Sequence, residues 1–420
     1  MYTTERRNIL FSWLVAAGLL LGHVQAQEWT RFRGPNGSGI GEAQGLPVRF
    51  TEKDFAWKIA LPGVGHGSPV VWGERVFLTS GDEETGTRYV LCHRAADGKQ
   101  LWQREFPGQT HRKHAHNSLA SATPVVDDRY VYASFAAPTD YLVVALTHDG
   151  KEVWQRDLGP YKAGHGAGGS MIVVDDLLIV PNEQEGNSSI LALERDTGKE
   201  RWKTERRSKA TYSTPCLYQP AGKPAELILT NWDHGITSLD PRTGKTLWEM
   251  DVFDKGHIET AISSPIVTGN LVLGTCGWLG VKKEVIAVDP SQRGPDGQGK
   301  PVYRIERSAP LVPTPLVVDD LLFLWADEGI VTCADARTGE VFWRERVPGT
   351  YYGSPVAVGK HIYGISREGD VMVLAAKREF ELLARNPLDE ASHSTPAMAG
   401  GRMFLRTFSH LIAIGGGERE

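Results

Sequence analysis

Two short motifs alternate along most of the chain, and their recurrence restricts the fold more than any other feature. The first motif places a glycine, usually followed by lysine, four residues before an aromatic residue, as Gly98 does before Trp102. An apolar stretch precedes each copy, so the motif predicts two strands joined by a tight turn. Glycine supplies the positive φ that such a turn requires. The aromatic members after Trp102 are Trp154, Trp202, Trp248, Tyr303 and Trp343.

The second motif is a Ser or Thr, usually followed by Pro, that introduces a short β-branched run. Several copies continue into an Asp-rich turn and another apolar stretch, which predicts a second hairpin. Together the two motifs predict four short strands in each period of roughly 40–55 residues, the size of a propeller blade. The eight copies begin at Ser68, Thr123, Ser170, Thr214, Ser264, Thr314, Ser354 and Thr395.

The two ends of the repeat region complete each other. The last period, which starts at Thr395, contains only three apolar stretches, whereas residues 55–60 provide an extra one ahead of Ser68. We therefore predict an all-β fold: an eight-bladed β-propeller of four-stranded antiparallel blades, closed by an N-terminal strand that completes the last blade. A β-sandwich, the competing all-β fold, predicts neither periodic tryptophans nor an unpaired strand at each end.

The recurring tryptophans are predicted to be structural. They occur once per blade on the outer strand, where an indole packs between neighbouring sheets and buries a large area. A cofactor-binding role would not require this period. The predicted structural set is Trp57, Trp102, Trp154, Trp202, Trp248 and Trp343.

The pattern Ala-x-Asp-x-x-Thr-Gly-Lys-x-x-Trp, best seen over residues 333–343, resembles the tryptophan-docking motif of the PQQ-repeat propeller superfamily. The resemblance extends over roughly residues 53–414. The superfamily includes quinoprotein alcohol dehydrogenases and BamB-like assembly proteins. The resemblance therefore implies either a non-catalytic binding or scaffold module for protein interaction, or a PQQ-dependent oxidoreductase acting on an alcohol or sugar.

The enzymes of this superfamily carry features that this chain does not match. They often have an adjacent pair of cysteines over the quinone, a calcium site of carboxylates and amides, and an aspartate base. The four cysteines here, Cys92, Cys216, Cys276 and Cys333, are far apart in sequence and form no CxxC spacing. We therefore expect no catalytic residue, metal or cofactor, with PQQ and calcium as the alternative. The cysteines are expected to be buried thiols.

Propeller topology predicts a candidate site at the mouth of the central channel. Residues just before each Ser/Thr motif, and the loops between second and third strands, lie on one face of the disc. Aromatic and imidazole side chains gather there, and they suit a protein, peptide or small-molecule ligand. The alternative is that they only satisfy backbone groups at the rim. The candidates are His66, His165, Glu183, Tyr212, Trp232, Tyr351, Tyr352 and His393.

The N-terminus and the charge balance restrict location and partners. Arg6 and Arg7 precede an apolar run over residues 9–21, and Ala26 offers a small residue for cleavage, so residues 1–26 are predicted to be a signal peptide. Residues 27–52 would then be a loop segment and residues 53–420 a single propeller, exported to the periplasm or secreted, with no membrane span after cleavage. A net charge of −5 argues against nucleic acid as a partner.

Overall fold

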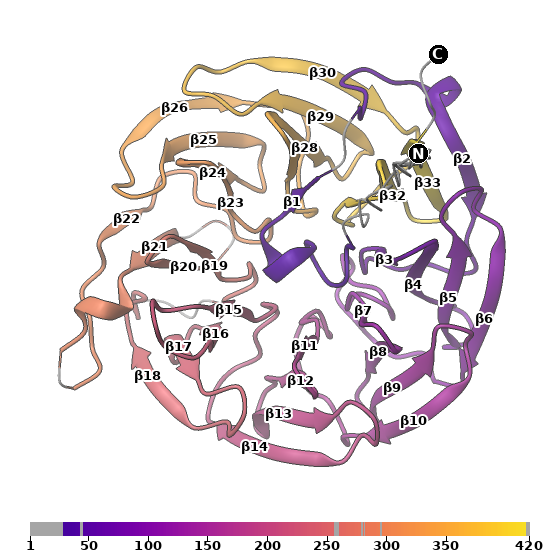
Figure 1. Ribbon diagram of the computed structural model, residues 1–420, viewed down its shortest axis with the longest axis horizontal. Coiled ribbons are helices and arrows are strands. Elements are labelled where there is room, and N and C mark those ends of the chain that lie inside the picture. The colour runs from indigo at the N-terminus through magenta and orange to yellow at the C-terminus, as the bar shows by residue number, and fades with distance from the viewer. Residues whose placement is uncertain are drawn as a thin grey trace, which may run out of the picture.

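The computed structural model describes residues 28–42, 45–255, 260–278, 280, 282–294 and 296–416; the predicted signal peptide lies outside them. Eight sheets are arranged around a central axis, each with its strands running outward in order (Figure 1). All neighbouring strands within a blade are antiparallel. The predicted eight-bladed propeller is therefore confirmed.

Each blade contributes four strands, and three short 3₁₀ helices, η1 (Pro35–Gly37), η2 (Glu52–Asp54) and η3 (Pro290–Gln292), lie outside them. Blades one to four are β3 (Val70–Trp72), β4 (Arg75–Gly81), β5 (Arg88–Arg94) and β6 (Gln100–Phe106); β7 (Val125–Val126), β8 (Tyr130–Ala136), β9 (Tyr141–Thr147) and β10 (Glu152–Asp157); β11 (Ile172–Val174), β12 (Leu177–Asn182), β13 (Ser188–Glu194) and β14 (Glu200–Arg206); and β15 (Cys216–Tyr218), β16 (Glu226–Asn231), β17 (Gly235–Leu239) and β18 (Thr246–Met250). Blades five to eight are β19 (Ile266–Thr268), β20 (Leu271–Gly277), β21 (Lys283–Val288) and β22 (Tyr303–Ile305); β23 (Leu316–Val318), β24 (Leu321–Trp325), β25 (Ile330–Asp335) and β26 (Val341–Arg346); β27 (Val356–Val358), β28 (His361–Ile365), β29 (Asp370–Ala375) and β30 (Leu382–Pro387); and β31 (Ala397–Ala399), β32 (Arg402–Arg406), β33 (His410–Gly415) and β2 (Phe55–Ala60).

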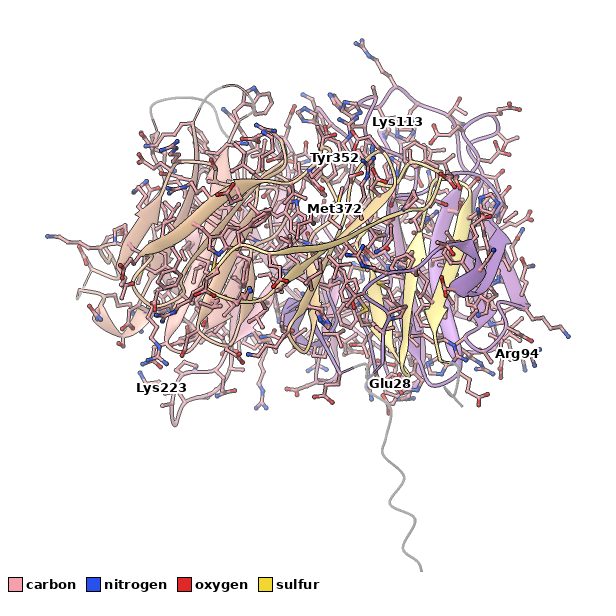
Figure 2. All side chains as sticks on the ribbon, turned by 90° about the horizontal axis from the view of Figure 1, so that it is seen from above. Glu28, Arg94, Lys113, Lys223, Tyr352 and Met372 are labelled. Carbon is pink, nitrogen blue, oxygen red and sulfur yellow. The ribbon has the colours of Figure 1, made fainter. Side chains whose placement is uncertain are left out.

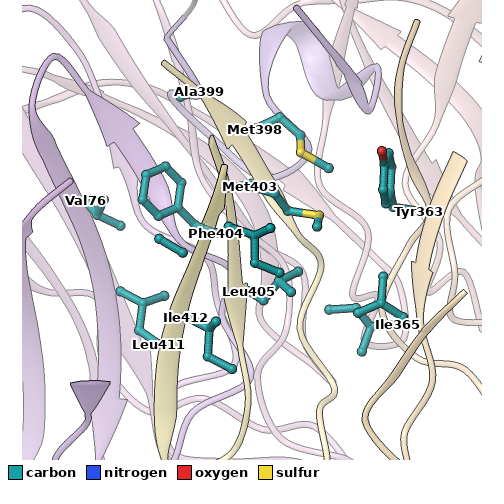
Figure 3. Close-up of a cluster of buried hydrophobic side chains, with 14 of the residues drawn as sticks. Val76, Tyr363, Ile365, Met398, Ala399, Met403, Phe404, Leu405, Leu411 and Ile412 are labelled. Carbon is teal, nitrogen blue, oxygen red and sulfur yellow. The ribbon is translucent and has the colours of Figure 1, made fainter. Parts of the chain in front are cut away.

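The last blade takes its outer strand from the start of the chain. Strand β2 pairs antiparallel with β33, and Trp57 lies opposite Ala413. This is the predicted closure, and it leaves the described propeller with a continuous ring of blades. Apolar side chains of blade eight fill the space between its neighbours, with Val76 of blade one on one side and Tyr363 of blade seven on the other (Figure 3).

The periodic tryptophans dock each blade onto the next. The indole N–H of Trp57 donates to the carbonyl of Ala95 at 3.0 Å, and a Cβ added to Gly98 would lie only 2.8 Å from the same ring. Glycine is therefore required where the next blade's turn approaches the indole. Trp102, Trp154 and Trp202 repeat both contacts with the blade that follows each of them.

Two members of the predicted tryptophan set depart from this pattern. Trp248 donates at 2.6 Å to the carboxylate of Glu226 in its own blade. Trp343 is only half-buried and donates to the carbonyl of Lys377 at 3.3 Å. Tyr303 takes the docking position in the blade between them, with its hydroxyl donating to Ala336 at 2.8 Å.

The eight Ser/Thr residues of the second motif form a closed ring of hydrogen bonds, which we call the hydroxyl belt. The backbone N–H of each one donates to the hydroxyl of the corresponding residue in the next blade, at 2.9 to 3.2 Å. The final bond runs from Thr395 back to Ser68. The belt links all eight blades around the channel. These bonds explain why a hydroxyl recurs at this position of the sequence.

The segment before β2 closes one end of the channel. Strand β1 (Ile40–Gly41) adds to blade seven in parallel with β27, and Asn36 exchanges two hydrogen bonds of 2.8 Å with the backbone of Leu217 in blade four. Trp29 is fully buried against blade one. The segment thus spans the channel from one side to the other, and η1 lies at its centre (Figure 1).

All four cysteines are buried, as expected. Burial raises the pKa of Cys216 to about 12, which keeps this thiol protonated. No helix in the described part of the chain has the length and apolar character needed to cross a membrane.

Candidate functional site

A cavity of about 350 Å³ occupies the channel at its other end, and we call it the cup. Its floor includes Phe32 from the N-terminal segment, and the hydroxyl belt surrounds its wall. Tyr352 marks the open face of the disc, opposite Glu28 (Figure 2). Because the N-terminal segment closes the far end, the cup is accessible from one face only.

Five of the predicted site residues line the cup: His66, His165, Tyr212, Tyr352 and His393. They come from blades one, three, four, seven and eight, so only the closed ring brings them together. His66 and His393 are neighbours across the junction where the chain closes, with ring centroids 4.5 Å apart. Tyr352 lies 5.0 Å from His393.

Three predicted residues do not reach the cup. Tyr351 is fully buried beside Trp325, because consecutive residues of an extended chain point in opposite directions and Tyr352 takes the inward position. Glu183 is buried and bonded to Arg206 at 2.8 Å. Trp232 lies between the ammonium groups of two lysines instead of facing the channel. For these three the loops lie on the correct face, but the side chains contact partners of their own or an adjacent blade instead of the channel.

The long loop between β6 and β7 adds two more imidazoles to the rim. His114 lies 4.7 Å from His165, and His116 lies 5.5 Å from Tyr352. The loop therefore extends from blade one toward blade three on one side and blade seven on the other. Its length and histidine content were visible in the sequence and its topology places it on this face, but its reach toward blades three and seven was not predicted.

Arg367, in the loop between β28 and β29, is a site residue that the repeat pattern did not indicate. Its guanidinium lies over the ring of Tyr352, 4.6 Å from the centroid. It also contacts a ring nitrogen of His393 at 3.4 Å and one of His116 at 3.3 Å. Phe32 and Trp278 are further lining residues that sequence reasoning missed, since neither belongs to a repeat motif.

The imidazoles beneath the rim are neutral at physiological pH. Burial, together with the neighbouring His393 imidazole and the positive charge of Arg406, lowers the pKa of His66 to about 3. Burial and the neighbouring Arg367 lower the pKa of His393 to about 4. A buried ring nitrogen on each, Nδ1, has no hydrogen-bond partner among the described residues. Both rings therefore line the cup as neutral imidazoles.

The donor set of the cup does not fit the calcium-bound quinone of the dehydrogenases. Calcium takes several oxygen ligands, of which carboxylates are the main protein source. The described lining residues include no aspartate or glutamate. Nor do the described ranges contain a group of three or more His, Cys, Asp or Glu side chains arranged to hold a metal ion.

The ring of docked blades and the one-sided cup define a PQQ-repeat propeller with a candidate binding site at the channel mouth. Comparison with known proteins agrees with this class. The family model described as outer membrane protein assembly factor BamB matches residues 51–225, 139–381 and 327–417. The chain therefore belongs to this PQQ-repeat, BamB-like family.

Individual relatives are distant. The chain is 23% identical over 284 residues to outer membrane protein assembly factor BamB of Yersinia pestis, which covers 64% of this chain and 68% of the relative. Among solved structures, BamB from Moraxella catarrhalis aligns with a TM-score of 0.62 at 15% identity, covering 86% of this chain and 98% of that one. A quinohemoprotein alcohol dehydrogenase from Pseudomonas putida HK5 aligns at 0.54 and 13% identity, covering 94% and 81%. At these identities the solved structures support the fold alone.

Proposed function

We propose that the chain is an exported, non-catalytic scaffold that binds a protein partner in outer membrane protein assembly. The relative from Yersinia pestis is an outer membrane protein assembly factor, and the family match extends over nearly the whole propeller. The lining of the cup supports a binding role over the oxidoreductase alternative, because its described residues include none of the carboxylates that a calcium-bound quinone would use. Turnover of an alcohol or sugar with added PQQ, calcium and a dye acceptor would contradict this proposal.

The observation that carries the proposal is the difference between the two faces. The N-terminal segment covers the channel on one face, whereas the other face presents the cup and the loops around it. Those loops include the long β6–β7 connection and the loop that carries the exposed ring of Trp278. A partner that docks on the open face meets side chains that differ from blade to blade, and such variation is what specific recognition requires.

Site-specific cross-linking tests which face binds. Lys113 lies on the open face and Lys223 on the opposite one (Figure 2). With the photoreactive residue p-benzoylphenylalanine at position 113, irradiation of cells should yield an adduct with a component of the outer membrane assembly machinery. The same residue at position 223 serves as the matched control and should yield none. Adducts from position 223 alone, or from neither position, would contradict docking on the open face.

Export rests on the sequence of residues 1–26 and has its own test. N-terminal sequencing of the protein recovered from the cell envelope should begin at Gln27. A mature protein that retains Met1, or one that fractionates with the cytoplasm, would overturn the proposed location.

A further inference from the structure

Three arginines around the channel are buried without any counter-charge. Arg31, Arg33 and Arg406 have at most 8% of their surface exposed, and none forms an ion pair in the described part of the chain. Their guanidinium groups donate to backbone carbonyls and one hydroxyl, and the Nε atom of each has no partner there. One carbonyl acceptor of each lies next to a residue of the hydroxyl belt: Pro215, Pro355 and Gly67.

These groups remain charged at physiological pH. Burial lowers the pKa of Arg33 and Arg406 to about 9 and that of Arg31 to about 10. A buried charge is costly unless an opposite charge or several hydrogen bonds stabilise it. Arg33 and Arg406 each donate three hydrogen bonds that stabilise the charge locally. The surroundings of the belt thus hold positive charges that no described carboxylate neutralises.

Arg367 places a fourth positive charge at the rim. It contacts only imidazole nitrogens and an aromatic face, and it forms no ion pair with a described residue. Acidic side chains of the same face bond elsewhere. Asp327 accepts the N–H groups of Leu311 and Val312 at 2.7 and 3.0 Å, and Glu368 accepts the hydroxyl of Thr350 at 2.8 Å.

The hydroxyl belt adds uncharged donors to this potential. Each belt oxygen already accepts an N–H from the preceding blade, and no bond among the described residues uses a belt hydroxyl as a donor. All eight hydroxyls line the cup. Their hydrogens can therefore point toward a bound group that accepts hydrogen bonds.

One part of the wall of the cup is apolar. Blades five and six contribute apolar surface from Ile262, Leu311, Val312 and Trp278. Arg367 and the imidazoles of His66 and His393 lie on the neighbouring arc of blades seven, eight and one, and the imidazole of His165 lies 5.6 Å from the ring of Trp278. A volume of about 350 Å³ suits a small molecule and is too small for a folded domain.

We propose that the cup binds a small organic anion, with its apolar body against Phe32 and the blade-five and blade-six wall and its anionic group toward Arg367 and the belt. The four guanidinium groups without an ion pair, the absence of a carboxylate from the described lining and the apolar surface of blades five and six together select this class of ligand. The inference goes beyond the proposed scaffold role and does not require a protein partner.

Calorimetric titration of the purified full chain with matched probes tests this class. 4-Phenylbutyrate carries both an apolar body and a carboxylate, 4-phenylbutanol lacks the charge, and butyrate lacks the aromatic body. We expect saturable binding of 4-phenylbutyrate, at least about tenfold tighter than of either control. Binding should weaken as salt is raised, because the attraction is electrostatic.

Variants of the charged rim and of the apolar wall make the test specific. Arg367→Gln should weaken 4-phenylbutyrate binding at least about tenfold and leave the alcohol unaffected. Trp278→Ala should weaken the acid and the alcohol together. Arg112→Gln removes an exposed arginine of the β6–β7 loop that forms no described ion pair, and it should change neither. Thermal melting of each variant confirms that it is folded.

Equal affinity for the acid and the alcohol would overturn the proposal, and so would an acid affinity that Arg367→Gln leaves intact. No saturable binding of 4-phenylbutyrate at millimolar concentration by the folded chain would also overturn it. These outcomes are separable from the scaffold role, because cross-linking at position 113 is measured without any probe acid. If one of the two results is obtained and the other is not, the missing result identifies which proposal fails.

Discussion

The perimeter and the mouth of this propeller are built from the same repeat, yet contacts recur at the perimeter whereas side chains vary at the mouth. At the perimeter an aromatic side chain bonds to the turn of the next blade in one blade after another. At the mouth, the position two residues before each belt hydroxyl changes from His66 to Gly168 to Ile262 to Tyr352. Positions that keep one contact in every blade maintain the ring, whereas positions that vary create a site with distinct sides.

The largest expected effect comes from opening the ring. Deleting residues 28–61 removes β2 and the segment that closes the channel, which exposes β33 as an edge and uncovers apolar surface between blades eight and one. We expect a loss of several kcal/mol of unfolding free energy, or failure to fold, in denaturant titrations. A deletion that melts like the complete chain would mean that the ring does not depend on its closure.

Removing a single docking tryptophan should have the next largest effect on stability. Trp57→Ala removes a buried indole and its bond to Ala95, so the free energy of unfolding should fall by about 3–5 kcal/mol. Trp343→Ala should cost less, since that ring is half-buried. Leu101→Ala, at an exposed perimeter position, is the control and should change stability by less than about 0.5 kcal/mol. Equal losses for all three would refute inter-blade docking as the cause.

The belt offers a smaller, chemically cleaner test. Thr314→Val keeps the shape of the side chain but leaves the N–H of Ser264 without its acceptor, which should cost about 1–3 kcal/mol. Thr314→Ser keeps the hydroxyl and should retain most of that stability in the same urea titration. If serine and valine destabilise equally, the hydroxyl is not what links these blades.

The smallest effect is expected at the mouth, where acid should weaken the fold. His66 and His393 have folded-state pKa values of about 3 and about 4, below the unfolded value, so the unfolded chain binds more protons between those values and about pH 6.5. Their contribution is fully present above about pH 6.5 and is lost as pH falls toward 4. The charges facing them are Arg406, Arg367, His116, Lys113 and Glu368.

Unfolding free energies measured at several pH values check this dependence. Each histidine should account for roughly 1–2 kcal/mol between about pH 6.5 and 5. His66→Gln and His393→Gln should flatten the curve over that interval. His111→Gln, in the loop between β6 and β7, is the control and should leave the curve unchanged. A curve that keeps its slope in both variants would show that other groups cause the acid sensitivity.

The perimeter was predictable from sequence because each contact there repeats. Trp57 lies on a strand that precedes the first repeat. Because it matches the other periodic tryptophans, the strand was predicted to complete the last blade, and β2 does so. The Ser/Thr motif fixed the position of the belt, although the hydrogen bonds that close it depend on blade spacing in three dimensions. Local periodicity therefore predicts the fold, and the fold then creates contacts that no single repeat contains.

The mouth was predictable only in part, because its contacts join segments that follow no common period. Counting back from each Ser/Thr motif located His66 and His393, but the same argument could not tell that Tyr351 turns into the core. Arg367 and Phe32 reach the cup from a short loop and from the N-terminal segment, and neither position repeats. The partners of Glu183 lie within blades three and four, so its burial depended on packing that the sequence does not display.

The division between perimeter and mouth is tested most directly by the affinity for 4-phenylbutyrate of two variants, each measured under conditions where it is folded. Trp154→Ala alters a perimeter indole that bonds to Arg195 of the next blade, and Arg367→Gln alters the rim of the cup. We predict that Trp154→Ala binds as the unaltered chain does, while Arg367→Gln binds at least about tenfold more weakly. Normal binding by Arg367→Gln together with weakened binding by Trp154→Ala would contradict the division.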